Sequence, residues 1–181
     1  MKRLCQWLLY KVMGWKKEVT VVHPQKYVIC LAPHTSNWDF VIGQLYSRAE
    51  GLGSNYLMKK EWFFWPLGCL FRKTGGIPVY RSRKSGGMTE ALADTAKREA
   101  EFHLTITPEG TRSYNAEWKK GFYYIAAEAH IPILLYALDY KKKLIKCTKS
   151  ICPMGDIEQE LPVIKEYYRG VTAKYPEKFG I

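Results

Sequence analysis

The feature that most constrains the fold is a regular alternation between two kinds of segment along the chain. Short apolar runs, such as residues 27–32, have the composition and length of buried strands. Between them lie longer segments, such as residues 38–50, in which apolar side chains recur with the period of a helix. Strands are predicted at residues 19–23, 27–32, 55–59, 77–80, 102–107, 131–140 and 143–150, and helices within residues 1–17 and at 38–50, 60–71, 86–101, 117–129 and 157–174. This order predicts an α/β fold, in which a layered, mostly parallel sheet with an antiparallel edge is flanked by helices.

No repeat, low-complexity tract or flexible linker interrupts the alternation. Hydrophobic residues make up 47% of the chain and aromatic residues 14%, which is typical of a globular protein rather than a disordered one. A chain of 181 residues is long enough to bury one sizeable core. We therefore expect residues 1–181 to form a single domain that begins with an N-terminal amphipathic helix.

The first 17 residues combine an apolar helical stripe with several basic residues. The stripe consists of Leu4, Leu8, Val12 and Trp15, widened by Trp7 and Leu9, and the cations are Lys2, Arg3, Lys11, Lys16 and Lys17. This pattern is typical of a helix lying in the membrane interface, although a helix packed on the protein's own core has the same pattern. The cations and the two tryptophans favour the membrane.

No apolar stretch of the chain approaches the roughly 18–20 residues that a membrane-spanning helix needs. The basic N-terminal segment also lacks the small-residue cleavage site of a signal peptide. We therefore expect a peripheral protein without a transmembrane segment.

The charge of the chain narrows the choice of partners. Lys and Arg number 28 against 17 acidic residues, which gives a formal net charge of +11 and a pI of about 9.4. Such an excess favours anionic partners, among them nucleic acid, a phospholipid surface, phosphorylated substrates and an acidic carrier protein. The lysines are scattered, and neither an RNP motif nor a basic recognition helix occurs, so we expect an anionic membrane surface and no nucleic acid.

The five cysteines are odd in number and form no CxxC pair, which favours a reducing, cytosolic compartment. They show no metal-ligand spacing with the histidines, and the chain has no glycine-rich phosphate loop of the Walker or Rossmann type. The sequence therefore predicts neither a metal nor a cofactor.

The stretch "CLAPHTSNWDF" (residues 30–40) places His34 five residues before Asp39. On a continuous helix these positions are rotated by about 140° and share no face. The two side chains meet only if His34 lies in the loop before a helix and Asp39 in its first turn. One interpretation is a catalytic pair; the other is a capping box, in which Ser36 begins the helix and Asp39 reaches back to it. The stretch alone leaves both open.

Two further stretches carry groups suited to binding an anion. In residues 75–84, a strand-like run is followed by Arg81. In residues 107–113, Glu109, Gly110, Thr111 and Arg112 lie in one turn. Arginine matches the geometry of phosphate, and a glycine lets backbone N–H groups approach an anion. Each stretch also has an ordinary interpretation as a solvated strand end or a turn. Both His34 and Glu109 fall just past predicted strands, which is where open α/β sheets place their sites.

In this order, the blocks resemble those of the glycerolipid acyltransferase family, which includes the 1-acylglycerol-3-phosphate (lysophosphatidate) acyltransferases. The family's H-x4-D box matches His34 to Asp39, its G-x-I-x-V-x-R block matches Gly75 to Arg81, its P-E-G-T-R-S block matches Pro108 to Ser113, and its hydrophobic-Pro-hydrophobic step matches Ile131 to Ile133. The resemblance covers about residues 30–135. Pro33, Tyr80 and Thr107 depart from the residues that are usual in the family, so the blocks leave the identity of the acceptor open.

The resemblance implies an acyl-CoA- or acyl-carrier-protein-dependent O-acyltransferase of phospholipid biosynthesis, acting on a lysophospholipid at the cytoplasmic face of a membrane. His34 would act as base and Asp39 as its partner, whereas Arg81 and the turn of Glu109, Gly110, Thr111 and Arg112 would hold the acceptor's polar head. In that turn Glu109 would orient an arginine or a substrate hydroxyl. Two alternatives stay open: a different lipid acceptor, such as an amino-acid-containing or lipid-A-like one, and a non-catalytic basic membrane-binding module.

Overall fold

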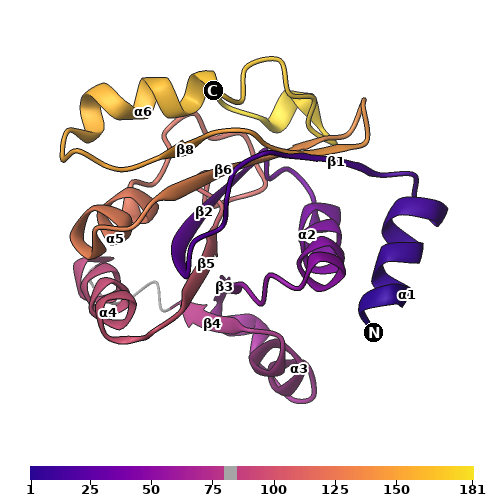
Figure 1. The fold of residues 1–181 in the computed structure, drawn as a ribbon, viewed down its shortest axis with the longest axis horizontal. Coiled ribbons are helices and arrows are strands. Elements are labelled where there is room, and N and C mark those ends of the chain that lie inside the picture. Colours follow the sequence, from indigo (N-terminus) through magenta and orange to yellow (C-terminus); the bar gives the residue numbers. More distant parts are fainter. Residues whose placement is uncertain (80–84) are drawn as a thin grey trace.

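In the computed structural model, which describes residues 1–79 and 85–181, helices pack around a twisted sheet (Figure 1). The strands are β1 (Lys16–Val19), β2 (Lys26–Ala32), β3 (Asn55–Lys59), β4 (Gly76–Val79), β5 (Phe102–Ile106), β6 (Ile133–Asp139), β7 (Leu144–Cys147) and β8 (Ser150–Ile151). The α-helices are α1 (Lys2–Gln6), α2 (Asn37–Glu50), α3 (Leu67–Lys73), α4 (Ser85–Arg98), α5 (Gly121–Ala129) and α6 (Ile157–Glu166). Shorter helical segments are the π-helix η1 (Trp7–Val12) and the 3-10 helices η2 (Lys60–Trp62) and η3 (Pro176–Lys178).

The strand order is β1-β7-β6-β2-β5-β3-β4, and β8 pairs with β6 outside this path. Strands β6, β2, β5, β3 and β4 are parallel to one another, as are β1 and β7, whereas β7 and β8 run antiparallel to β6. The predicted α/β class, with a mostly parallel sheet, is confirmed. Because β2 and β5 are parallel neighbours, their carboxyl ends lie at the same edge of the sheet.

The core lies on both faces of the sheet, and the central strand β2 contributes to each. Its alternate residues divide between the two faces: Val28, Cys30 and Ala32 pack with α4, α5 and α6, and Tyr27, Ile29 and Leu31 pack with α1, η1 and α2. Figure 1 shows α4 and α5 on one side of the strands and α1 and α2 on the other. Burial on both faces explains why β2 is a continuous apolar run rather than an alternating one.

Several predicted boundaries differ from the structure. The first strand lies at Lys16–Val19 instead of 19–23, because the backbone there pairs with the edge strand β7, whereas Val22 is 84% exposed. The predicted strand at 143–150 is divided into β7 and β8, whose registers against β6 differ by one residue, as a β-bulge produces. The predicted helix at 60–71 is divided at Pro66, the N-cap residue of α3. The last helix ends at Glu166 rather than near 174.

The N-terminal helix buries one side of its apolar stripe and exposes the other. Its inner side chains, Cys5 and Leu9, are buried against α2, and Trp15 follows them into the core. Its outer side chains, Leu4, Trp7 and Val12, are more than half exposed. The helical segment ends at Val12 and is followed by Gly14 with a φ of 71°, a backbone conformation that glycine favours. Within the residues that the structure describes, no helix is long and apolar enough to cross a membrane.

Candidate active site

The loops after β2 and β5 meet at the carboxyl edge of the sheet. Strands β2 and β5 pair up to Cys30 and Ile106, so His34 and Glu109, which follow within a few residues, are neighbours. The backbone N–H of His34 donates a hydrogen bond to Glu109 Oε1 at 2.6 Å. The sequence placed both residues just past strand ends, and the parallel pairing brings them together.

Asp39 is fixed by hydrogen bonds in the first turn of α2. Its Oδ2 accepts from the backbone N–H groups of Thr35 and Ser36, each at 2.7 Å, and its Oδ1 accepts from the hydroxyl of Tyr140 at 2.5 Å. The Ser36 hydroxyl in turn accepts from the backbone N–H of Trp38 and completes a capping box. Asp39 is 1% exposed. The capping interpretation of this stretch is therefore correct, and it accounts for the orientation of the carboxylate.

The catalytic interpretation is compatible with the same geometry. His34 lies in the loop before α2, and its Nδ1 is 3.4 Å from Asp39 Oδ2. This separation is longer than a hydrogen bond, and Nδ1 has no hydrogen-bond partner among the described residues. Catalytic contacts are often long in the absence of substrate and tighten when it binds. A proton on Nδ1, facing Asp39, leaves Nε2 unprotonated and able to accept a proton.

Glu109 is fully buried and acts on the His34 loop. Its Oε1 accepts the His34 N–H, whereas Oε2 is buried without a hydrogen-bond partner among the described residues. Burial, with a smaller contribution from the Asp39 charge, raises the pKa of Glu109 to about 7, although the His34 N–H opposes this rise. The backbone carbonyl of Glu109 accepts from Asn115 Nδ2 at 2.8 Å. In this arrangement the carboxyl group holds the backbone beside the histidine, and no described arginine pairs with it.

The raised pKa of Glu109 predicts a pH-dependent stability. A carboxyl group with a higher pKa in the folded than in the unfolded chain lowers the free energy of unfolding as pH rises from about 4.5 to about 7. Glu109→Gln keeps an acceptor for the His34 N–H and removes this titration. Over that interval we expect wild type to lose on the order of 1–3 kcal/mol relative to Glu109→Gln. Urea unfolding on both sides of the interval measures the difference, and Glu117→Gln, an exposed carboxyl in the same loop, is the control. A pH-independent difference between Glu109→Gln and wild type would contradict the prediction.

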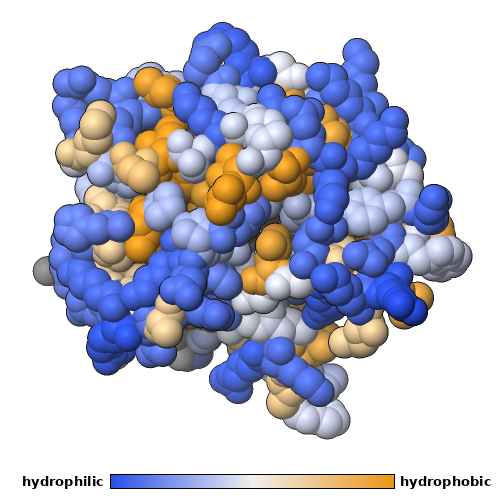
Figure 2. Space-filling model, viewed as in Figure 1, coloured by the Kyte–Doolittle hydropathy of each residue, from blue (hydrophilic) through white to orange (hydrophobic). Residues whose placement is uncertain are grey.

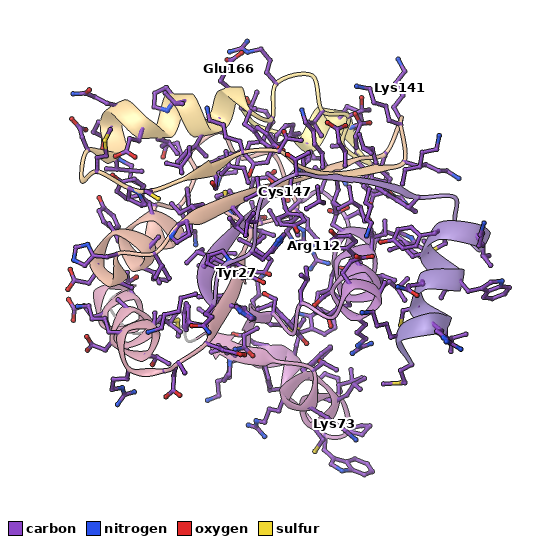
Figure 3. All side chains as sticks on the ribbon, in the orientation of Figure 1. Tyr27, Lys73, Arg112, Lys141, Cys147 and Glu166 are labelled. Atoms are coloured by element: carbon purple, nitrogen blue, oxygen red, sulfur yellow. The ribbon has the colours of Figure 1, made fainter. Side chains whose placement is uncertain are left out.

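The turn after Glu109 faces the same cleft as His34. Gly110 has a φ of 65°, and a Cβ there would lie 2.8 Å from Lys119 Cε, so the turn favours glycine at this position. The backbone N–H of Gly110 donates a hydrogen bond to the carbonyl oxygen of Thr107 at 3.1 Å. Thr111 and Arg112 line the cleft with it. In Figure 3, Arg112 lies near the middle of the molecule, whereas Lys73 lies at its lower end.

The structure gathers most of the residues that the sequence selected. His34, Asp39, Glu109, Gly110, Thr111 and Arg112 all line one cleft. Arg81 lies outside the described residues. Within residues 1–79 and 85–181, no three His, Cys, Asp or Glu side chains are grouped so that they could hold a metal ion.

The cleft is large and its lining is mostly apolar. Its volume is about 2630 Å³, and much of its wall comes from α2 and the strands β3 to β5, namely Phe40, Tyr56, Leu57, Ile77, Val79 and Ile106. Trp62 and Phe71, from the aromatic run at residues 62–71, also line it. Figure 2 shows hydrophobic residues reaching the surface in the middle of the view, with hydrophilic residues around them. The cleft can accommodate an extended alkyl chain next to a polar end.

Tyr140 belongs to the site, and the sequence analysis did not identify it. It lies directly after β6 and reaches Asp39 across a sequence separation of 101 residues. No motif contains Tyr140. It lies near Asp39 because β6 pairs with β2 in the sheet, which the local sequence does not show.

The fold and the site define a class of α/β protein with a histidine and an aspartate at the carboxyl edge of a mostly parallel sheet. A family model described as Acyltransferase matches residues 16–138, which is more than half of the chain, and the chain belongs to the Acyltransferase family. The family inferred from the blocks between His34 and Ile133 is confirmed.

The chain is also similar to two individual proteins. The chain is 36% identical over 77 residues to the human 1-acyl-sn-glycerol-3-phosphate acyltransferase beta, a match that spans 40% of this chain and 27% of the human protein. It also resembles the crystal structure of the 1-acyl-sn-glycerophosphate (LPA) acyltransferase PlsC from Thermotoga maritima, with a TM-score of 0.66 and 18% identity. That match covers 94% of this chain and 74% of PlsC, and it shows that the two share a fold.

Proposed function

We propose that the protein transfers a fatty acyl group from acyl-CoA or acyl-carrier protein to a free hydroxyl of a lysophospholipid such as 1-acylglycerol-3-phosphate, as a step of phospholipid biosynthesis. The observation that carries the proposal is the 3.4 Å approach of His34 Nδ1 to Asp39 Oδ2 in a cleft that also contains Arg112. This transfer needs a base for the acceptor hydroxyl, a ligand for the acceptor's phosphate and an apolar groove for the acyl chain. The two similar proteins, the human 1-acyl-sn-glycerol-3-phosphate acyltransferase beta and the LPA acyltransferase PlsC, support a lysophosphatidate-type acceptor.

The chemistry is direct transfer through one tetrahedral intermediate. Nε2 of His34 takes the proton of the acceptor hydroxyl while the oxygen attacks the thioester carbonyl. Asp39, facing Nδ1, stabilises the imidazolium as it forms. Collapse of the intermediate breaks the carbon–sulfur bond, and the imidazolium returns its proton to the departing thiolate. The products are the ester and a free thiol, and the histidine is restored to its starting state.

The cysteines do not favour a covalent acyl-enzyme. Cys30 and Cys147 are fully buried, and burial raises the pKa of each thiol to about 12, which leaves them protonated and unreactive near neutral pH. Cys5 is buried against α2, and the exposed Cys69 and Cys152 are absent from the described lining of the cleft. This argues against an acyl-enzyme on cysteine and supports the acceptor hydroxyl as the proposed nucleophile.

Arg81 and Arg112 are proposed to bind the acceptor's phosphate, since a guanidinium pairs with phosphate through two hydrogen bonds. We expect Arg81→Ala to raise the KM for lysophosphatidate about tenfold or more and to change the KM for the thioester much less. Steady-state kinetics with each substrate varied in turn measures this split, and Arg98→Ala, an exposed arginine at the end of α4, is the control.

An unchanged acceptor KM in Arg81→Ala would remove that residue from the binding site. The same assay with monoacylglycerol, which has the hydroxyl but no phosphate, separates recognition of the phosphate from recognition of the chain. Faster turnover of an acceptor without phosphate would favour the alternative lipid acceptors over lysophosphatidate.

A peripheral position on the cytoplasmic face of an anionic membrane would supply such an acceptor. Several of the exposed apolar side chains lie on three segments: on α1 and η1, at the start of α2, and from η2 to α3. They are Leu4, Trp7, Val12, Trp38, Val41, Trp62, Phe64, Trp65 and Leu70. Tryptophan and leucine next to basic residues are typical of surfaces that enter the headgroup region, and the net charge of +11 adds electrostatic attraction to anionic lipid.

A further inference from the structure

Tyr140 contacts the His34–Asp39 pair through the carboxylate oxygen that does not face the histidine. Its hydroxyl donates to Asp39 Oδ1 at 2.5 Å, and Oδ2 of the same carboxylate lies 3.4 Å from His34 Nδ1. Tyr140, Asp39 and His34 therefore form a series in which the Asp39 carboxylate lies between the phenol and the imidazole. Asp39 is 1% exposed, so solvent has little access to Oδ1 as a substitute donor.

The phenol of Tyr140 is held by its neighbours. The ring of Trp15 meets it edge-on, with ring centroids 5.2 Å apart and an interplanar angle of 85°. The backbone N–H of Tyr140 donates to Thr172 O at 2.8 Å, and the ammonium of Lys174 lies 5.8 Å from the ring centroid. Burial, followed by the hydrogen bond to Asp39, raises the pKa of the Tyr140 hydroxyl, so it remains a protonated donor near neutral pH.

We propose that Tyr140 is a positioning residue for the His34–Asp39 pair, and that its hydroxyl fixes the Asp39 carboxylate and lowers the proton affinity of the pair. The catalytic consequence rests on the proposed function; the effect on protonation does not. With Oδ1 anchored by the phenol and Oδ2 by two backbone N–H groups, the carboxylate has one orientation, with Oδ2 toward Nδ1. A donor on Oδ1 also stabilises the anionic carboxylate, so its loss makes the coupled pair bind a proton more tightly.

Other charged or titratable groups face this series. Among the described residues they include the Glu109 carboxyl on the His34 N–H, the Lys174 ammonium over the Tyr140 ring, Lys143, which lines a small pocket with Tyr140, and the Tyr175 phenol. The pKa of Glu109 is about 7, so its titration overlaps the pH range in which a histidine base gains its proton. A test of Tyr140 must therefore be repeated without the Glu109 charge.

The kinetic test is the pH profile of kcat/KM for thioester consumption by wild type and Tyr140→Phe, in the wild-type and the Glu109→Gln backgrounds. We expect kcat/KM to fall about tenfold at pH 7 and the acid limb to move to higher pH by about half a unit or more in both backgrounds. The control is Tyr123→Phe, because Tyr123 donates a hydrogen bond of the same 2.5 Å length to the buried carboxylate of Glu160, away from the cleft. It should leave the acid limb in place.

The second test does not depend on turnover. The pH midpoint of the His34 Hε1 resonance, assigned by its absence in His34→Ala, should move to higher pH in Tyr140→Phe and stay unchanged in Tyr123→Phe. If the wild type showed no turnover and Tyr140→Phe still moved this midpoint, the proposed function would be overturned and the positioning role supported. The positioning role would be overturned if Tyr140→Phe moved neither the pH midpoint of the His34 resonance nor the acid limb of kcat/KM. It would also be overturned if Tyr123→Phe moved them by the same amount.

Discussion

His34→Ala is expected to lower kcat by about 10²–10⁴-fold, which is the range that a positioned general base contributes. An alcohol near pH 7 is a weak nucleophile, and in the cleft the unprotonated Nε2 of His34 is the group proposed to take its proton. The substitution removes the base and leaves the Asp39 capping box of α2 and the backbone bond to Glu109 in place. We therefore expect the KM values for both substrates to change little.

The control for this variant is a histidine outside the cleft. His130 is exposed after α5, with a left-handed backbone (φ of 53°) that asparagine tolerates, so His130→Asn removes an imidazole at little structural cost. Its activity should stay near that of wild type. Near-full activity of His34→Ala would exclude the proposed base.

Asp39→Asn should lower kcat on the order of 10²-fold or more and also destabilise the fold. The amide cannot stabilise an imidazolium, and it favours the wrong tautomer of His34. Its oxygen, in the place of Oδ2, accepts from the Thr35 and Ser36 N–H groups only as a neutral and therefore weaker acceptor, and its NH2 group, in the place of Oδ1, cannot accept from the Tyr140 hydroxyl. Loss of a helix cap costs about 0.5–2 kcal/mol. Steady-state kinetics and urea unfolding measure the two effects separately.

Ser36→Ala separates the two roles of Asp39. This variant removes the side chain that accepts the Trp38 N–H, and so weakens the same helix start without touching the His34–Asp39 approach. We expect it to lose a similar free energy of unfolding and to keep activity within a few-fold of wild type. If Ser36→Ala lost as much activity as Asp39→Asn, Asp39 would act through the start of α2 rather than through His34.

The fold class was predictable because its determinants are local. Strand β2 is a continuous apolar run because both of its faces are buried. Helix α2 has a helical apolar period because only one of its faces is buried. Boundaries were less predictable where pairing decides them: β1 forms at Lys16–Val19 because β7 lies beside it, and a one-residue change of register separates β7 from β8.

The candidate site was predictable to the extent that it follows strand ends. His34, Asp39 and the turn from Glu109 to Arg112 are contiguous in two short stretches, and one strand pairing joins them. The contact of Glu109 with the backbone of His34 depends on the depth of burial, which spacing does not encode. Tyr140 depends on the packing of β6 beside β2, and Arg81 stays a prediction from the sequence.

The most direct test of the central claim is a single assay in which the pure protein acts on vesicles containing lysophosphatidic acid, beside His34→Ala. Release of free thiol and formation of acylated lipid are followed together, first with acyl-CoA and then with acyl-carrier protein. We expect wild type to release thiol and form phosphatidic acid in equal amounts with at least one donor, and His34→Ala to be slower by about 10²–10⁴-fold. Thiol release with neither donor, or equal release by wild type and variant, would contradict the account.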